Sequence, residues 1–251
     1  MTGGTGTIGR HVVAELAARG HEVRALSRHA ERYAVDLTTG AGLTAALAGV
    51  DVVVDASNAS SSTADARATL VDGTRRLLAA EHDAGVQHHV LVSIVGCHDV
   101  PMAYYGVKVE QERAVSAGEV PWTVVAVTQF HEFVAGTLAG AARRGVVPLL
   151  RAPVQPVAAQ DAASAVADAA ERAPRRSTTT VAGPEVLDLR DAARAWRAAT
   201  GSRALPVRVP LPGKLGRALR AGGLTDPRPD ARGTTTFAGW LAAQRTAAAA
   251  R

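Results

Sequence analysis

A serine, a tyrosine and a lysine form the most informative set of potentially reactive side chains. Ser93 ends a run of apolar, β-branched residues, and Tyr104 and Lys108 lie four residues apart in the helical pattern that follows. Side chains at this spacing share one face of a helix. Reduction of a carbonyl needs a proton donor at the developing alkoxide, and a tyrosine can serve when a nearby cation lowers its pKa. We therefore interpret Tyr104 as the proton donor, Lys108 as the cation and a ribose ligand, and Ser93 as the group that orients the carbonyl.

Further candidates lie beside this set. Tyr105 competes with Tyr104, because a tyrosine three residues before Lys108 also lies on its face of the helix. The segment Thr128–Glu132 follows another apolar run and contains His131. The imidazole of a histidine has a pKa near the working range, so His131 could carry a proton. A histidine that only fixes the loop is the simpler alternative. The residues expected on the substrate side are Tyr105, Gln129, Phe130 and His131.

The glycine-rich segment Thr2–Gly9 predicts a dinucleotide site. Gly3, Gly6 and Gly9 recur every three residues, a spacing that allows a tight turn, close approach of a pyrophosphate and close packing of helix on strand. The helical pattern from Ile8 to about Arg19 would direct its first N–H groups at the phosphates. The expected phosphate contacts are Gly3, Thr5, Gly6, Thr7 and Ile8.

The residues after the second predicted strand bear on cofactor choice. A carboxylate there would bind the ribose 2′-hydroxyl of NAD, whereas a cation would bind the 2′-phosphate of NADP. The chain has Ser27 and Arg28 and no acid, which favours NADP(H) over NAD(H), although Arg28 by itself is also compatible with an ordinary surface residue. Further cofactor contacts are expected after the next strands, with Asp36 and Leu37 at the adenine and Ala56, Ser57 and Asn58 along the nicotinamide ribose.

The elements that must position these residues alternate between two patterns. Short β-branched runs occur at 21–26, 34–37, 51–55, 88–93 and 122–127, and amphipathic stretches lie at 8–19, 40–48, 64–84 and 104–116. This alternation predicts an α/β fold with a Rossmann-type, doubly wound parallel sheet. We place this NAD(P)-binding core at residues 1–135.

The pattern changes in residues 136–251. Prolines punctuate 146–157, helices are predicted at 161–172, 188–200, 213–221 and from about 236, and a strand at 177–182. We interpret this half as a small C-terminal substrate lobe, partly interwoven with the core and not an independent domain.

Bulk composition narrows the class of protein. The 251 residues carry a net charge of +5, but the arginines are scattered and not interleaved with aromatic residues, so no nucleic-acid partner is expected. Cys97 is the single cysteine, and neither a disulfide framework nor a metal site is expected. Without a long apolar run or a signal peptide, the sequence predicts no membrane association and a cytoplasmic location. No helix shows a spare apolar stripe, which favours a monomer over a dimer.

The position of Met1 conflicts with the glycine turn. Such a turn follows a buried strand, yet only Met1 precedes Thr2. A central strand of one residue would leave backbone groups of its neighbours without partners. We expect the natural chain to begin some five to seven apolar-rich residues earlier.

Several stretches resemble the atypical short-chain dehydrogenase/reductases of the NmrA-like, NAD(P)-binding branch. They are Thr2–Gly9, Val90–Gly96, Tyr104–Lys108, Thr128–Glu132, Ala182–Pro184 and Thr236–Leu241. The resemblance implies a Rossmann fold and NAD(P) binding. It leaves the reaction open, because the branch includes reductases, biosynthetic tailoring enzymes and catalytically silent redox sensors.

Together these features predict an NAD(P)H-dependent oxidoreductase acting on a carbonyl or conjugated system of a hydrophobic small molecule. The apolar, proline-rich second half favours an aromatic, polyketide-type substrate, and a tailoring role in secondary metabolism such as antibiotic biosynthesis follows by analogy. The alternative is a non-catalytic NADP redox sensor that needs no proton donor. A third possibility is a phenolic substrate that supplies its own proton.

Overall fold

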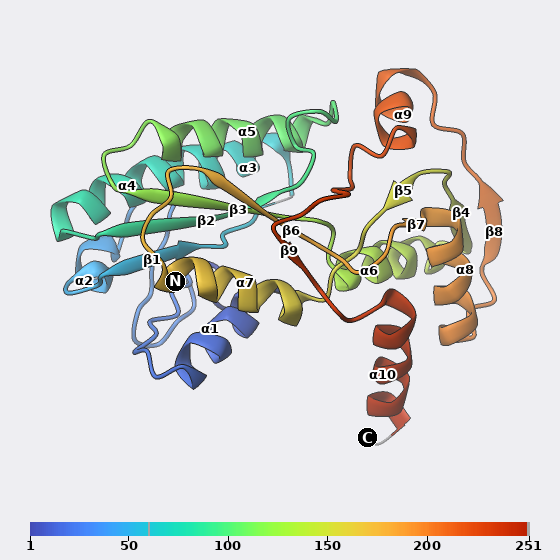
Figure 1. Cartoon of the computed structure of the whole chain (residues 1–251), viewed down its shortest axis with the longest axis horizontal. Helices are drawn as coiled ribbons and strands as arrows, with labels where there is room; N and C mark the ends of the chain where they lie inside the picture. Colours follow the sequence, from blue (N-terminus) through green and yellow to red (C-terminus); the bar gives the residue numbers. More distant parts are fainter. Residues whose placement is uncertain (60, 250–251) are drawn as a thin grey trace.

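A five-stranded parallel sheet forms the centre of the molecule. The computed structural model describes residues 1–59 and 61–249. The strands lie in the order β1 (Val52–Asp55), β2 (His88–Ile94), β3 (Trp122–Val127), β6 (Thr178–Ala182) and β9 (Ala231–Arg232) (Figure 1). The apolar runs within β1, β2 and β3 (Val52–Val54, Val90–Val92 and Val124–Val127) are typical of strands that helices cover on both faces of the sheet. The strands predicted at 51–55, 88–93, 122–127 and 177–182 are confirmed.

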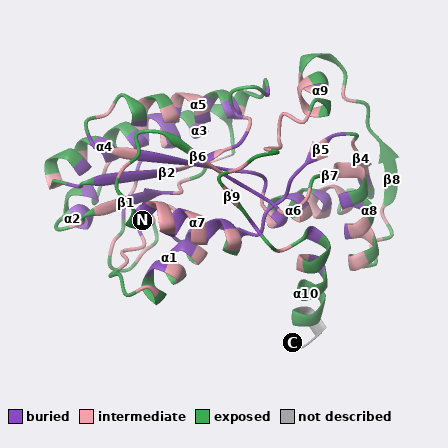
Figure 2. Cartoon of the chain, in the orientation of Figure 1, coloured by how far each residue is buried: buried purple, intermediate pink, exposed green. Residues whose placement is uncertain are grey.

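Helices form a layer on each side of this sheet. On one side α1 (Gly9–Ala18) packs against α7 (Ala159–Glu171), and on the other lie α2 (Leu43–Leu47), α4 (Gly73–Ala84) and α5 (Ala103–Ser116). Each layer encloses its own apolar cluster, one around Val12 and Val166 and the other around Leu47, Leu77 and Leu91. Figure 2 shows the buried strands between helices that are exposed on their outer faces. The predicted Rossmann-type, doubly wound fold is confirmed.

The strands predicted at 21–26 and 34–37 appear only as isolated bridges. Thr2 pairs in parallel with Leu26 on one side and with Asp55 on the other, and Ser27 pairs with Ala34. These bridges extend the sheet beyond β1 in the expected order, but regular pairing does not develop. Among the described residues, backbone hydrogen bonds to the segment 21–26 on this side come from Met1 and Thr2 alone, so regular strand pairing does not extend along it.

The single helix predicted over 64–84 is interrupted. The chain forms α3 (Thr63–Ala66), a π-helical stretch η1 (Arg67–Asp72) and then α4. The hydroxyl of Ser62 caps α3 by accepting from the Asp65 N–H at 3.1 Å. Extra residues inserted into a helix in this way often occur at functional sites. The irregular turn precedes Thr74, a member of the buried network described below.

The C-terminal half builds a small lobe and then returns to the main sheet. Its elements are α6 (His131–Ala142), the paired strands β4 (Val146–Leu149) and β8 (Leu205–Arg208), the paired strands β5 (Pro153–Val154) and β7 (Leu187–Asp188), α8 (Leu189–Thr200), α9 (Gly213–Arg220) and α10 (Phe237–Ala249). Val134, Trp196 and Phe237 form the centre of its apolar core. Because α7, β6 and β9 belong to the main sheet and its helical cover, the two halves are interwoven (Figure 1).

Within residues 1–59 and 61–249, no helix combines the length and apolar character that crossing a membrane requires.

Candidate active site

The backbone of the glycine turn is packed so closely at Gly3 and Gly9 that neither position has room for a side chain. Gly3 has φ +65°, and a Cβ on it would lie 2.3 Å from the Ala56 carbonyl oxygen. A Cβ on Gly9 would lie 2.0 Å from the carbonyl oxygen of Gly3. The Gly6 N–H donates to that same carbonyl at 2.9 Å. The turn therefore needs glycine where the sequence has it, and it brings the loop after β1 against the start of α1.

The turn fits the phosphates of a dinucleotide. Thr5, Gly6 and Thr7 are exposed at the N-terminus of α1, while Ile8 and Gly9 are buried beneath them. The first N–H groups of a helix lack partners within the helix and carry its positive dipole end, which together bind anions. The predicted phosphate residues lie together in this turn. Ile8 is a packing residue whose side chain belongs to the main core.

The region predicted to bind the adenosine of the cofactor has the exposed side chain of Arg28 and a carboxylate, Asp36, that is hydrogen-bonded within its own turn. Arg28 is exposed after the bridge residue Ser27, whose hydroxyl accepts from the His29 N–H at 3.3 Å. The carboxylate of Asp36 accepts from both the N–H and the hydroxyl of Thr38, at 2.8 and 2.7 Å. These two hydrogen bonds, with a smaller contribution from the positive charge of Arg28, lower the pKa of Asp36. Asp36 is thus occupied by hydrogen bonds to Thr38, and the exposed charge in this region is the positive charge of Arg28.

Tyr104 reaches the loop that follows β1. Its hydroxyl donates to Asn58 Oδ1 at 2.7 Å, and this loop begins at Ala56, the residue in contact with Gly3. Burial raises the pKa of Tyr104. The expectation that Lys108 lowers this pKa is not met, because the lysine charge does not act on the phenol in this arrangement.

Lys108 points into the protein. Its side chain is 3% exposed, and Nζ donates to the Val92 carbonyl at 2.9 Å and to Gln111 Oε1 at 2.6 Å. Burial lowers the pKa of Lys108, an effect that the charges of Asp55 and Glu112 oppose. The lysine therefore ties α5 to β2, and its contact with the ribose stays a prediction.

Asp55 is the hub of a buried polar network between the glycine turn and α5. One carboxylate oxygen accepts from the Thr2 hydroxyl at 2.6 Å and the Ser57 N–H at 2.9 Å. The other accepts from the Thr74 hydroxyl at 3.1 Å and Gln111 Nε2 at 3.2 Å. Through Gln111 the network continues to Lys108. It fixes the turn, the π-helical region and α5 relative to one another.

Ser93 belongs to a second cluster, centred on Glu112. The Ser93 hydroxyl donates to Glu112 Oε1, the Cys97 thiol lies 3.5 Å from the same oxygen, and His98 Nε2 lies 2.6 Å from Oε2. Burial, followed by the charge of Glu112, raises the pKa of Cys97 to about 12. The ligand atoms of Cys97, His98 and Glu112 lie within 4.8 Å of one another, but hydrogen bonding accounts for the cluster. The predicted role of Ser93 in orienting a substrate requires its hydroxyl to leave Glu112.

Tyr105 lies in an apolar cluster at the interface with the C-terminal lobe. It packs with Cys97 and Val100, against Leu215 and Leu224 from the lobe. Burial raises the pKa of Tyr105 to about 12. Of the two adjacent tyrosines, Tyr104 therefore has the more accessible hydroxyl, and Tyr105 is mainly a packing residue.

The segment after β3 is more buried than predicted. Gln129 donates to the Leu224 carbonyl at 3.2 Å, while its own carbonyl oxygen is buried without a partner among the described residues. Phe130 pairs through its backbone with Val157 and packs on the main core. Three residues of the segment have a buried polar atom without a partner among the described residues: Gln129 (Oε1), His131 (Nδ1) and Glu132 (Oε2).

His131 is a core residue. It is 0% exposed, its Nε2 lies 3.0 Å from the Thr235 carbonyl oxygen, and its ring lies 5.4 Å from Phe237 and 5.7 Å from Trp240. Only the protonated nitrogen of a neutral ring can donate to that carbonyl, so Nε2 is the donor. Burial lowers the pKa of His131. These surroundings fit the simpler alternative of a loop-fixing histidine, and a contact of His131 with substrate stays a prediction.

Sequence reasoning overlooked Asp55, Thr74, Gln111 and Glu112. Gln111 and Glu112 lie three and four residues after Lys108, a helical spacing that was available as a signal. Their partners come from β1, β2 and α4, and those contacts depend on how α5 docks on the sheet. No pattern within one element reveals such a network.

Comparisons with known proteins agree with this geometry. A protein-family model described as NAD(P)H-binding matches residues 3–173. The chain is 31% identical over 123 residues to a 3-beta-hydroxysteroid dehydrogenase of Mycolicibacterium neoaurum, an alignment that covers 40% of this chain and 34% of that protein. The chain thus spans about a third of the length of the curated relative it matches.

Two solved structures share the fold across nearly the whole chain. The NADPH complex of the Escherichia coli quinone oxidoreductase QOR2 has 19% identity and a TM-score of 0.76, covering 97% of this chain and 98% of that chain. The NADP(H) complex of the Citrobacter sp. triphenylmethane reductase has 20% identity and a TM-score of 0.67, covering 98% of this chain and 87% of that chain. With the glycine turn, the Rossmann sheet and the family match, the chain belongs to the NAD(P)H-binding family, in the atypical, NmrA-like branch of the short-chain dehydrogenase/reductases.

Proposed function

We propose that the protein is an NADPH-dependent reductase acting on a carbonyl or conjugated system of a hydrophobic small molecule, with Tyr104 as the proton donor. One observation carries this proposal. The Tyr104 hydroxyl lies 2.7 Å from Asn58, on the loop whose first residue, Ala56, touches Gly3 of the phosphate turn. A tyrosine hydroxyl is thus held at the edge of the sheet where ligands bind in open α/β folds.

The side chains at this edge of the sheet would each have a separate role in the reaction. Bound NADPH supplies the hydride. Tyr104 donates the proton to the oxygen that becomes an alkoxide, and its raised pKa keeps it protonated at neutral pH. Asn58 holds the phenol until substrate replaces it as the hydrogen-bond partner. Lys108 acts through position, because it fixes α5 to the Val92 carbonyl.

The substrate class follows from the apolar cluster beside Tyr104. Tyr105, Cys97 and Val100 meet α9 and the segment after it, and Tyr104 itself packs at the edge of this cluster. These residues are buried, and a substrate site that opens beside them would have apolar walls, which favours a flat, hydrophobic molecule over a sugar nucleotide. An aromatic ketone or quinone, of the kind tailored in aromatic polyketide biosynthesis, suits it. The related enzymes named for quinone, triphenylmethane and hydroxysteroid substrates agree with this class.

The preference for NADPH rests on charge at the adenosine end. Arg28 is exposed there, and Asp36 is occupied by Thr38. The positive charge of Arg76 also acts on Asp36, so a 2′-phosphate would meet two cations. A 2′-hydroxyl would find no free carboxylate among these residues.

A redox sensor is the second candidate, favoured by one observation. The Lys108 ammonium bonds to the Val92 carbonyl and to Gln111, so within the described part of the chain it makes no hydrogen bond to the phenol of Tyr104. Such a site could bind NADPH and report its redox state without turning over substrate.

Replacement of Tyr104 by phenylalanine separates these functions. We expect Tyr104→Phe to lower the rate of NADPH oxidation with an aromatic ketone by about 10²–10⁴-fold, the contribution typical of a general acid, while NADPH affinity is retained. Tyr105→Phe is the matched control and should retain most of the activity. If the wild-type protein binds NADPH but oxidises it with no ketone or quinone in a broad panel, the sensor function stands. Full activity of the Tyr104→Phe protein would exclude Tyr104 as donor and favour a substrate that supplies its own proton.

A further inference from the structure

One surface of the C-terminal lobe gathers exposed apolar side chains. Among the described residues, seven large apolar side chains are exposed, and four of them lie on the ribbon of β4 and β8 or directly after it. They are Val146, Leu205, Val207 and Val209, and Leu205 is 68% exposed. Figure 2 shows β8 exposed along its whole length at the edge of the lobe. Apolar side chains gathered on a surface in this way mark a contact site.

These side chains share the outer face of the ribbon. Successive side chains of a strand point to opposite faces, and register partners in a parallel pair point to the same face. Val147 is buried against the lobe core, so Val146 and Pro148 point outward. Their register partners Leu205 and Val207 point outward with them, and the alternation continues beyond β8. The β4–β8 face therefore consists of Val146, Pro148, Leu205, Val207 and Val209.

The two stretches that build this face carry cations and no acid. Residues 143–151 contain three arginines, and residues 203–220 contain four arginines and a lysine, with no aspartate or glutamate in either stretch. All eight basic side chains are exposed, and none is in an ion pair with another described residue. They are Arg143, Arg144, Arg151, Arg203, Arg208, Lys214, Arg217 and Arg220. This concentration of positive charge attracts an anionic partner.

A cavity of about 400 Å³ lies at the end of the β4–β8 face. Its lining consists of Arg151, Val209, Pro210, Leu211, Pro212 and Arg220. The Arg220 guanidinium donates to the Leu211 carbonyl at 2.6 Å, which fixes this cation at the cavity. Asp188 is near enough to interact with the charge of Arg151, but it already accepts two hydrogen bonds of 2.9 Å from the guanidinium of Arg190. The cavity thus has two cations beside apolar walls.

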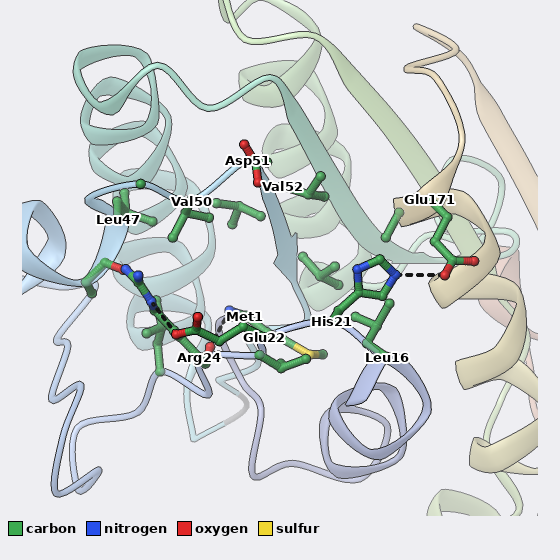
Figure 3. Close-up of a pocket in the computed structure, with 17 residues that line it drawn as sticks. Met1, Leu16, His21, Glu22, Arg24, Leu47, Val50, Asp51, Val52 and Glu171 are labelled. Atoms are coloured by element: carbon green, nitrogen blue, oxygen red, sulfur yellow. Dashed lines mark hydrogen bonds and ion pairs between the residues drawn. The ribbon is translucent and has the colours of Figure 1, made fainter. Parts of the chain in front are cut away.

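A second cavity, beside β1, differs in its charge. Its volume is about 450 Å³, and Figure 3 shows its basic side chains next to acidic ones. His21 lies 2.8 Å from Glu171, and Arg24 lies 3.9 Å from Glu22. The basic groups of that cavity therefore have acidic partners within the chain, whereas Arg151 and Arg220 are in no ion pair with a described residue.

We propose that the β4–β8 face and the cavity at its end bind the surface of an anionic membrane. The apolar side chains would enter the boundary between headgroups and acyl chains, and a lipid phosphate would pair with Arg151 and Arg220. A second copy of the chain suits this face less well, because it would bring the same eight cations against it. A nucleic acid would satisfy the charges but leave the apolar face without an apolar partner.

This membrane contact revises one expectation from the sequence. The sequence predicted no membrane association because it has no apolar run long enough to span a bilayer, but a contact with the bilayer surface needs no such run. The contact does not depend on the proposed function, since binding to vesicles requires neither cofactor nor substrate.

Co-sedimentation with vesicles tests the proposal. We expect the protein to bind vesicles of equal parts phosphatidylcholine and phosphatidylglycerol at least about tenfold more tightly than vesicles of phosphatidylcholine alone. Arg208→Gln combined with Arg217→Gln should weaken binding to the anionic vesicles by about 25-fold, about fivefold for each cation. Leu205→Ser combined with Val207→Ser should weaken it by about tenfold, because less apolar surface leaves water. All four side chains are exposed, so circular dichroism should show both variants folded.

A matched control separates the surface from net charge. Arg75→Gln combined with Arg113→Gln removes the same charge from α4 and α5, which lie at the opposite end of the molecule from β8 (Figure 1). This control should weaken vesicle binding by less than about threefold, because salt screens distant charges. An equal loss in the control and in the Arg208→Gln, Arg217→Gln protein would overturn the proposal, since net charge alone would then explain the binding.

Four further results would also overturn it. Equal binding to both kinds of vesicle would show that anionic lipid is not recognised. Unchanged binding of the Leu205→Ser, Val207→Ser protein would show that the β4–β8 face stays out of the bilayer. A dimer in light scattering that this variant dissociates would assign the face to a second copy of the chain. Loss of vesicle binding in millimolar glycerol phosphate would assign the cavity to a free phosphate compound.

Discussion

Replacing Asp55 by asparagine tests the buried network that holds the phosphate turn to the catalytic helix. The carboxylate is 0% exposed and accepts four hydrogen bonds, from Thr2, Ser57, Thr74 and Gln111. An asparagine of the same shape has one acceptor oxygen, so its amide group would face the donor of Gln111. Hydrogen bonds to a charged group contribute about 1.5–3 kcal/mol each. We expect Asp55→Asn to lower the free energy of unfolding by about 2–4 kcal/mol.

Urea denaturation followed by circular dichroism at neutral pH measures this loss. The matched control is Asp72→Asn, because the Asp72 side chain is 45% exposed and its one ion pair among the described residues is with Arg75, across one helical turn. Such an exposed pair contributes less than about 1 kcal/mol. A change in unfolding free energy for Asp55→Asn no larger than that of the control would refute the role assigned to the network.

The pH dependence of the difference gives a second check. Burial by itself raises the pKa of Asp55, but the charge of His89 and hydrogen bonds from Thr2 and Ser57 hold the pKa below its ordinary value of 3.8. A group with a depressed pKa stabilises the folded state fully above its ordinary pKa and loses that contribution as pH falls through the folded value. The wild-type advantage over Asp55→Asn should therefore be constant from neutral pH to about pH 5 and shrink below pH 4.

Two further substitutions probe the cofactor site. Arg28→Ala should raise the Kd for NADPH by about tenfold in isothermal titration and leave the Kd for NADH unchanged. The control Arg113→Ala, on α5, should change neither Kd. Equal effects of Arg28→Ala on both cofactors would exclude a contact between Arg28 and the 2′-phosphate. Gly3→Ala, with φ +65° and a Cβ 2.3 Å from the Ala56 oxygen, should cost more than about 3 kcal/mol in unfolding free energy and abolish NADPH binding. Gly49→Ala, with φ +69° and no atom within 4 Å, should cost about 1 kcal/mol, and a similar loss at Gly3 would show that its contact with Ala56 is unimportant.

Much of the fold is predictable because its strands are buried on both faces. Val52–Val54 and Val124–Val127 are apolar without interruption, a pattern typical of a parallel sheet covered on both faces. The segment 21–26 was also predicted as a strand, although His21, Glu22 and Arg24 interrupt its apolar residues, and among the described residues it forms one bridge. Strand formation depends on a neighbouring strand as well as on composition. The π-helical stretch Arg67–Asp72 was missed for a related reason, since an inserted residue scarcely alters the helical period.

The parts of the site that depend on the residues of a single helix or turn could be predicted from the sequence. The glycine turn needs glycine for local steric reasons, and its spacing shows this directly. Lys108 shares α5 with Tyr104, but its ammonium extends to the Val92 carbonyl on β2, and that direction depends on how the helix docks. His131 follows a predicted strand and has a side chain able to transfer protons, but it is buried against Phe237, which comes from the distant C-terminal segment. Contacts between elements decide these cases, and spacing along one element does not encode them.

Isotope transfer is the most direct test of the proposed reaction. The protein would be incubated with an aromatic ketone and NADPH carrying deuterium at one face of nicotinamide C4, and in a separate reaction at the other face. The proposal predicts that the alcohol product contains one deuterium at the carbinol carbon in one of the two reactions and none in the other. If NADPH is bound but no alcohol forms from any ketone tested, or if the alcohol contains deuterium in neither reaction, hydride transfer beside Tyr104 is contradicted.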